Sequence, residues 1–151
     1  MKEKFYVTTA IDYVNAEPHI GHAYQKIIAD ALSRWHSLLK KEVFFLTGTD
    51  EHGKKIARAA ESANLKPKEF TDKMSKKFRD SWENLGIIPN RFIRTTDADH
   101  KKSVYEITEK INRSGDLYKG AYEGVYCTDC ETFYTEKDAP ELICPIHKKP
   151  L

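Results

Sequence analysis

Thr8-Thr-Ala-Ile-Asp-Tyr-Val-Asn-Ala-Glu-Pro-His-Ile-Gly-His-Ala-Tyr24 is the stretch on which the fold of this chain depends. Before it, Phe5-Tyr-Val7 favours a β-strand. After it, apolar residues follow a helical period at Ile27, Ile28, Ala31, Leu32, Trp35, Leu38 and Leu39. A strand that turns into a helix presents free backbone N–H groups and the positive end of the helix dipole. The turn is therefore a candidate phosphate site.

His19, Gly21 and His22 carry the chemistry of this turn. A lone histidine is usually a surface residue or a satisfied core residue. Here two imidazoles three residues apart lie on one face of the first helical turn, where both can bond phosphate oxygens. Gly21 allows a nucleotide to approach the backbone without meeting a Cβ atom. Together they predict a nucleotide-binding turn.

Composition limits the classes of protein that remain. The chain has 151 residues, enough for one sizeable core or one core with a small appendage. The charges of its 25 basic and 23 acidic residues nearly cancel. This balance argues against a protein that mainly binds nucleic acid through electrostatic attraction. The apolar run Val43–Leu46 is too short for a bilayer, and the start of the chain lacks the apolar core of a signal peptide. We expect a cytoplasmic protein without membrane association.

The periodicity predicts an α/β fold with a parallel sheet. Strand, helix and strand within the first fifty residues form a βαβ unit, which implies a right-handed crossover. A shift to Tyr- and Gly-rich sequence after Gly115 suggests strand hairpins and a domain boundary, giving domains 1–115 and 116–151. The expected strands are 4–9, 43–46 and 92–94, and the expected helices are about 21–40, 54–64, 67–85 and 100–113.

Thr47-Gly-Thr-Asp-Glu-His-Gly-Lys54 follows the second expected strand, where open α/β sheets bind their ligands. Asp50 can hold a substrate ammonium group there, and Gly48 and Gly53 would let the loop approach the ligand. The alternative is that Thr49 or Asp50 caps the helix that starts near Lys54.

All three cysteines lie in the last quarter of the chain. Cys127-Thr-Asp-Cys130 is followed after thirteen residues by Cys144-Pro-Ile-His147. A single Cys-x-x-Cys pair can be redox-active or coincidental, but two such pairs can complete a tetrahedron. Three thiolates and an imidazole predict a structural Zn²⁺ site that supports the folding of a segment with little core of its own.

The His-Ile-Gly-His turn resembles the nucleotide-binding signature of the class I aminoacyl-tRNA synthetases. The wider stretch from Tyr13 to Tyr24, together with the cysteine–histidine pattern, resembles the methionyl type over nearly the whole chain. The resemblance implies the first half of a Rossmann-like fold, followed by the start of an inserted zinc-knuckle domain. It also implies that methionine is activated by ATP, accompanied by Mg²⁺, and transferred to tRNA(Met).

The resemblance implies roles for individual residues. His19, Gly21 and His22 would bind ATP, with the two histidines as catalytic groups. Methionine-binding residues would be Ala10, Ile11, Tyr13, Asp50 and His52. Tyr13 is alternatively core packing, and His52 alternatively supports its loop. Most relatives carry Pro-Ile-x-Tyr or Leu-Pro-Tyr where this chain has Ala10-Ile-Asp-Tyr13, and Asp12 places an acidic residue beside the expected pocket.

Family members continue into the second half of the nucleotide fold and an anticodon-binding domain. We therefore expect this chain to be an N-terminal portion that needs the C-terminal half of the synthetase, in the same gene product or as a separate chain, and that catalyses poorly alone. Lys73-Met-Ser-Lys-Lys77 nearly matches the second class I signature, but its apolar neighbours mark a helical stripe, so its charges are interpreted as a solvated helix face. A small nucleotidyltransferase and a non-catalytic synthetase half that binds tRNA or a partner remain as alternatives.

Overall fold

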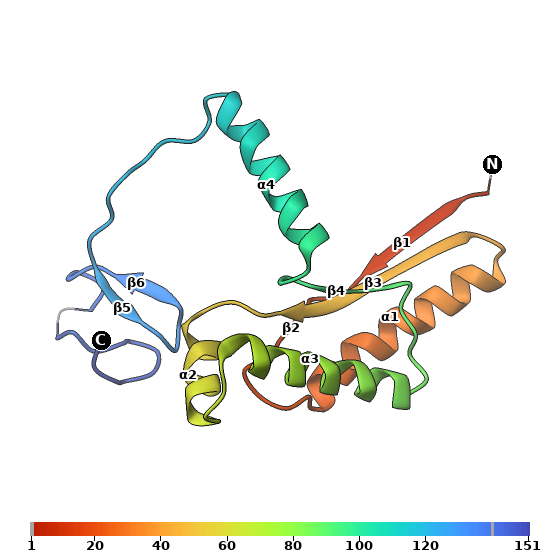
Figure 1. Ribbon diagram of the computed structural model, residues 1–151, viewed down its shortest axis with the longest axis horizontal. Helices are drawn as coiled ribbons and strands as arrows, with labels where there is room; N and C mark the ends of the chain where they lie inside the picture. The colour runs from red at the N-terminus through yellow and green to blue at the C-terminus, as the bar shows by residue number, and fades with distance from the viewer. Residues whose placement is uncertain (1, 140) are drawn as a thin grey trace. The chain divides into compact units, whose positions relative to one another are not determined.

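A computed structural model describes residues 2–139 and 141–151 (Figure 1). Its elements in chain order are β1 (Lys4–Thr8), β2 (Asp12–Tyr13), α1 (Ile20–Leu38), β3 (Glu42–Asp50), α2 (Lys54–Ser62), α3 (Pro67–Asn84), β4 (Arg91–Arg94), α4 (Ala98–Arg113), β5 (Val125–Cys127) and β6 (Thr132–Tyr134). Packing divides the chain into two compact units, one ending at Ser103 and one starting at Val104. The domain boundary near residue 115 stays a prediction.

The first unit is built on a parallel sheet, as expected. Strand β3 pairs with each of the other three strands: β1 lies along its first half, β2 beside its last two residues and β4 along Leu46–Thr49. Every pairing is parallel. The carboxyl ends of the strands therefore point to the same edge of the sheet.

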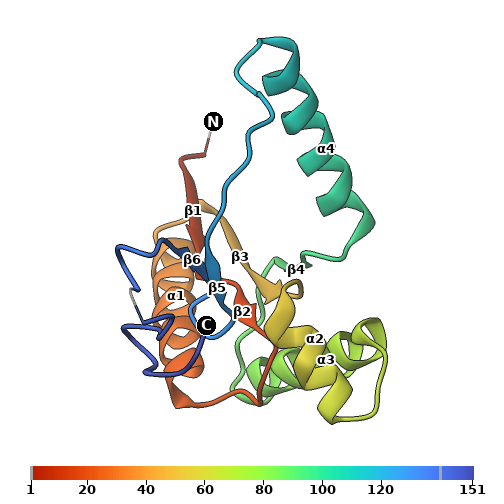
Figure 2. The same cartoon turned by 90° about the vertical axis from the view of Figure 1, so that its left-hand side faces the viewer.

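Helices cover one face of this sheet. From β1 to β3 and from β3 to β4 the chain moves in the same direction, so two right-handed crossovers place their helices on the same side. Helices α1 and α3 indeed lie below the sheet in Figure 1, and Figure 2 shows the same elements after a turn of 90° about the vertical axis. The core between them consists of Val14, Ala29, Phe45, Ile56, Met74, Phe78, Trp82 and Ile87. On the opposite face the rings of Tyr6 and Phe44 are exposed.

Helix α1 has the expected position but not the expected packing. The seven apolar residues that define its period, from Ile27 to Leu39, are all exposed. The helix instead buries Lys26, Ala29 and Ser33. Small side chains at two of these positions allow the helix to approach the sheet closely, and Lys26 has a buried partner described below. An apolar stripe therefore identified the helix but not its buried face.

Strand β3 is longer than expected. The residues Thr47–Asp50, interpreted as a loop, continue the strand. The hydroxyls of Thr47 and Thr49 are buried and hydrogen-bonded, to Thr9 at 2.7 Å and to Ser75 at 3.1 Å, so polar residues are accommodated inside the sheet. Gly48 does not bend a loop towards a ligand: a Cβ atom there would lie 1.9 Å from the carbonyl oxygen of Ile93 in β4. Its role is close strand pairing.

The other helices and strands match the expectations within a few residues. Gly86 and Gly115 follow α3 and α4 with positive φ angles of 70° and 82°, as expected for glycines that end helices. The Tyr- and Gly-rich segment is different, because residues 116–124 form no strand and the hairpin of β5 and β6 begins only at Val125. In the residues described here, no helix is both long and apolar enough to span a membrane.

Candidate functional site

The predicted methionine-binding residues of the first unit lie at the carboxyl edge of the sheet. Ala10 and Ile11 connect β1 with β2. Tyr13 in β2 pairs in register with Asp50, the last residue of β3, and the N–H of Val14 donates to the carbonyl of Asp50 at 3.3 Å. Strand pairing thus brings Tyr13 and Asp50 together although they are distant in sequence. Their contact with methionine stays a prediction.

The two histidines of the turn cap helix α1. His19 is the N-cap residue, and its Nδ1 accepts from the N–H of Gly21 at 3.1 Å. His22 Nδ1 accepts in return from the N–H of His19 at 3.2 Å. The two rings lie 3.8 Å apart between centroids. A Cβ atom at position 21 would lie 2.9 Å from the ring of His19, so glycine is required for this arrangement.

The cap fixes how the histidines can act. A ring nitrogen that accepts a hydrogen bond carries no proton, so each neutral ring keeps its proton on Nε2. Both Nε2–H groups are then donors at the positive end of the dipole of α1. Burial lowers the pKa of His22, with smaller lowering by His19 and Lys26 and an opposing effect of Asp12. The neutral, donating form of His22 is therefore favoured at neutral pH.

Asp12 faces the protein interior. Its carboxylate forms a salt bridge with the Lys26 ammonium, and both side chains are at most 2% exposed. Lys26 also donates to the carbonyl oxygen of Ala10 at 3.1 Å. Burial raises the pKa of Asp12, while the hydrogen bond from Lys26 acts in the opposite direction. Through these two contacts Lys26 ties β2 and the segment before it to α1, less than two helical turns from the histidine cap.

A second buried network surrounds Glu51, directly after β3. Its carboxylate accepts from Thr49, Thr96 and, through two nitrogens, Arg94. Burial raises the pKa of Glu51, but these hydrogen bonds outweigh it, and the pKa lies below its usual value. The hydrogen bonds of Arg94 to Glu51, and a further one to Asp72 at 2.6 Å, raise the pKa of Arg94 despite its partial burial. The pair is therefore fully ionised at neutral pH.

This network contradicts the capping alternative for Thr49 and Asp50. The N-cap of α2 is Gly53, which has a φ of 114° and no side-chain cap. Thr49 instead donates to Glu51. His52 is exposed, and its Nε2 lies 3.4 Å from the carbonyl oxygen of Thr95, a contact that fits loop support. Whether His52 also contacts substrate stays a prediction.

The stretch Lys73–Lys77 lies within α3, as interpreted. Met74 and Ser75 are buried, whereas Lys73 and Lys76 form exposed ion pairs one helical turn away, with Glu69 and Asp80. It is a regular helical segment and not a loop.

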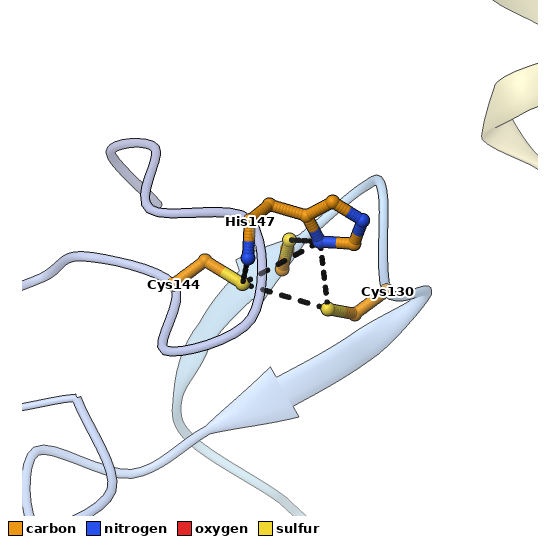
Figure 3. A group of neighbouring side chains, drawn as sticks. Cys130, Cys144 and His147 are labelled. Carbon is orange, nitrogen blue, oxygen red and sulfur yellow. Dashed lines mark hydrogen bonds between the residues drawn. The ribbon is translucent and has the colours of Figure 1, made fainter.

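The second unit gathers all three cysteines and His147 (Figure 3). Cys127 and Cys130 flank the turn between β5 and β6, and Cys144 and His147 lie in a loop near the end of the chain. The four ligand atoms all lie within 4.8 Å of one another. The Sγ of Cys130 is 3.5 Å from that of Cys144 and 3.1 Å from Nδ1 of His147.

These distances fit a tetrahedral metal site. With Zn–S bonds of about 2.3 Å, the sulfur atoms of a tetrahedron lie about 3.8 Å apart. Burial raises the pKa of Cys144, but hydrogen bonds from His147 and the neighbouring cysteines outweigh it and lower the pKa to about 6. The pKa of Cys130 is raised instead: the hydrogen bond from Tyr134 lowers it, but burial and the hydrogen bonds with Cys144 and Cys127 outweigh that effect. A thiolate is the form that binds metal. The donor set, three sulfurs and one imidazole nitrogen, matches closed structural zinc sites.

Sequence reasoning missed Lys26, Glu51 and Arg94. Lys26 looked like an ordinary polar position of an amphipathic helix, and nothing in the local pattern marks it as buried. Arg94 and Glu51 could have been found from the sequence. Each is a charged residue at the carboxyl end of a parallel strand: Arg94 ends β4, and Glu51 directly follows the neighbouring β3.

Comparisons with known proteins agree with these features. The family model of the class I (M) tRNA synthetases matches residues 5–150. The methionine–tRNA ligase of Thermotoga maritima is 49% identical over 98% of this chain and 24% of its own length, and that of Helicobacter pylori is 46% identical over 95% and 23%. Mycobacterium tuberculosis methionyl-tRNA synthetase in complex with methionyl-adenylate superposes with a TM-score of 0.85 at 44% identity, over 90% of this chain and 27% of that one.

The chain thus spans about a quarter of the length of the curated relatives that it matches. The matched residues 5–150 contain the capped histidine turn, the carboxyl edge of the parallel sheet and the cysteine–histidine cluster of this chain. The chain belongs to the class I (M) family of tRNA synthetases.

Proposed function

We propose that this chain is the N-terminal catalytic portion of a cytoplasmic methionine–tRNA ligase, which activates methionine with ATP and Mg²⁺ and charges tRNA(Met). The observation that carries the proposal is the reciprocal histidine cap. It presents two Nε2–H donors at a helix N-terminus, beside a sheet edge that holds Asp50 and Tyr13. The names of the relatives and the adenylate in the Mycobacterium tuberculosis complex support it.

In this mechanism the methionine carboxylate attacks the α-phosphate of ATP and displaces pyrophosphate. Asp50 holds the ammonium group of methionine. The pocket for the rest of the amino acid is lined by Ala10, Ile11, Tyr13 and His52. His19 and His22 donate to phosphate oxygens as negative charge develops, supported by the backbone at Gly21. In-line attack at phosphorus needs positioning and charge neutralisation and no covalent participant from the protein. The methionyl group then passes to the tRNA.

The second unit has a structural part in this proposal. Cys127, Cys130, Cys144 and His147 hold Zn²⁺, which stabilises the knuckle and leaves no open coordination position for chemistry. The knuckle begins an insertion in a Rossmann-like fold whose second half lies in the C-terminal part of the relatives. Because half of the nucleotide site would be supplied by that part, the isolated chain is a very poor catalyst.

Methionine-dependent exchange of pyrophosphate into ATP tests the proposal. We expect little exchange by this chain alone and clear exchange by the full-length synthetase that contains it. In that protein His22→Ala should reduce kcat by about a hundredfold or more, the usual effect of losing one donor to a developing charge. His100→Ala, which alters a histidine of α4 that takes no part in the histidine cap, serves as the matched control. Exchange without any amino acid would instead indicate a nucleotidyltransferase, and binding of tRNA without exchange would indicate a non-catalytic half.

A further inference from the structure

Glu51 is an unusual residue for a position next to a solvent-facing site. Its side chain is fully buried, yet it keeps its charge. Burying a carboxylate is costly unless it is paired and hydrogen-bonded. Glu51 meets this condition with four hydrogen bonds: two from Arg94 at 2.6 and 2.8 Å, one from Thr49 at 2.7 Å and one from Thr96 at 2.6 Å.

The partners of Glu51 connect two strand ends. Arg94 is the last residue of β4, and Thr96 lies in the turn that follows. The intervening Thr95 makes two further contacts: its hydroxyl accepts from the N–H of Glu51 at 2.9 Å, and its carbonyl lies 3.4 Å from Nε2 of His52. The segment after β3 is thus fastened to the segment after β4 through both side chains and backbone. We name Glu51, Arg94, Thr95 and Thr96 the strand-end clamp.

The clamp lies next to Asp50. Successive side chains of an extended strand point to opposite sides. Because Glu51 is drawn inwards by Arg94, the preceding Asp50 is directed the other way, where it is only partly buried. On its other side, Asp50 is held by the pairing of β3 with β2. The backbone on both sides of this carboxylate is therefore fixed.

We propose that the strand-end clamp positions Asp50 for the ammonium group of methionine, so that Glu51 and Arg94 are positioning residues that set methionine affinity without touching substrate. This inference rests on the proposed function, because it assigns an effect to the amino-acid side of that site. The nucleotide side depends on the histidine cap of α1, which shares no hydrogen bond with the clamp among the described residues. Loosening the clamp should therefore affect methionine and ATP unequally.

The test is pyrophosphate exchange by the full-length synthetase that contains this chain, with methionine and ATP varied separately. Arg94→Lys keeps the charge but loses the two-nitrogen fork that grips Glu51. We expect the KM for methionine to rise about tenfold to a hundredfold, as for a small misplacement of a binding group, and the KM for ATP to change less than about threefold. Arg113→Lys makes the same replacement in an exposed pair with Glu109, joined by a single contact of 3.1 Å from Nε, and should change neither constant.

A milder pair of variants covers the case in which Arg94→Lys does not fold. Thr96→Val deletes one hydrogen bond to Glu51 with little change in shape, and Thr96→Ser restores the hydroxyl. Thr96→Val should raise the KM for methionine several-fold, and Thr96→Ser should return it to the original value. Equal changes in both KM values, or no change, would overturn the clamp while leaving the proposed function intact. Absence of methionine-dependent exchange in the unaltered protein would overturn both.

Discussion

The sheet edge of the first unit and the cysteine–histidine cluster of the second reach a fixed geometry in opposite ways. At the sheet edge, side chains from four separate segments are placed by a core of eight buried residues and by buried ion pairs. In the second unit the buried apolar residues described are Cys127, Ala139 and Cys144, two of which are proposed zinc ligands. The geometry of the sheet edge is therefore set by the hydrophobic core of the first unit. In the second unit, the proposed metal site would supply the stability that a core supplies elsewhere.

The difference predicts how each site responds to damage. Where many separate contacts support a site, a single mutation removes only part of the stability, because each contact contributes a small share of the total. A site whose ligands are also its core fails as a whole when the metal is lost. The following predictions are arranged from the largest expected effect to the smallest.

Removal of zinc should have the largest effect. Free energies of zinc binding to small structural sites are about 10–16 kcal/mol, much more than the second unit can gain from three buried residues. A strong chelator, or Cys144→Ser, should unfold residues 104–151 while the first unit stays folded. Metal content and residue-resolved NMR measure the two outcomes, and re-addition of zinc is the control for the chelator. If the second unit stayed folded without metal, it would not depend on zinc in the way that distinguishes it from the first unit.

Truncation in the core should be next. Phe78 is fully buried between α3 and the sheet, in edge contact with His22 and Trp82. Phe78→Ala should lower the free energy of unfolding of the first unit by about 3–5 kcal/mol, measured by denaturant titration. Zinc affinity should stay unchanged. Leu38→Ala, at a position of α1 in the same unit that is 72% exposed, should cost less than about 0.5 kcal/mol.

Acid should weaken the first unit through Glu51. Burial raises its pKa, but the hydrogen bonds from Arg94, Thr96 and Thr49 outweigh this and place it below the usual 4.5. A lowered carboxyl pKa stabilises the folded state above the unfolded-state value, and the contribution is lost as pH falls through the folded-state value. Glu51→Gln should therefore be less stable at pH 7 and show a flatter decline below about pH 4.5. If the free energy of unfolding fell with pH in the same way for the original protein and for Glu51→Gln, the lowered pKa of Glu51 would not be the cause of the acid sensitivity.

The smallest effect concerns the stretch that resembles the second synthetase signature. Lys76 forms an exposed ion pair with Asp80 on α3. Lys76→Ala should change the free energy of unfolding by less than about 0.5 kcal/mol, as exposed helical pairs do. Pyrophosphate exchange by the full-length protein should stay within about twofold of the original rate. A large loss of exchange would show that this helix face takes part in the reaction.

The sequence predicted local features better than distant ones. The cysteine pairs came together as expected, because each pair needs only a tight turn and the ligand chemistry is specific. The parallel sheet followed from the βαβ pattern, and the helices were placed within a few residues. These features depend on spacing and propensity over short distances, which a single sequence carries directly.

The sequence predictions that failed for buried polar residues share a physical cause: a partner far away in the sequence satisfies the charge or hydrogen bond of each residue. Lys26 is buried because Asp12 neutralises it, and β3 runs on through Thr47 and Thr49 because Thr9, Ser75 and Glu51 satisfy their hydroxyls. A polar residue with such a partner looks identical in sequence to one in water. The apolar side of α1 shows the converse, since its period indicated a helix without indicating which face is covered.

His19 and His22, which we propose as catalytic groups, also cap helix α1. Losing an N-cap side chain typically costs about 0.5–2 kcal/mol of stability, independently of any substrate. A library of His19 and His22 variants sorted only for cellular abundance would thus already be depleted of most replacements. Tolerance measured at these positions combines a foldability requirement with a chemical one, and only assays normalised to the amount of folded protein separate the two.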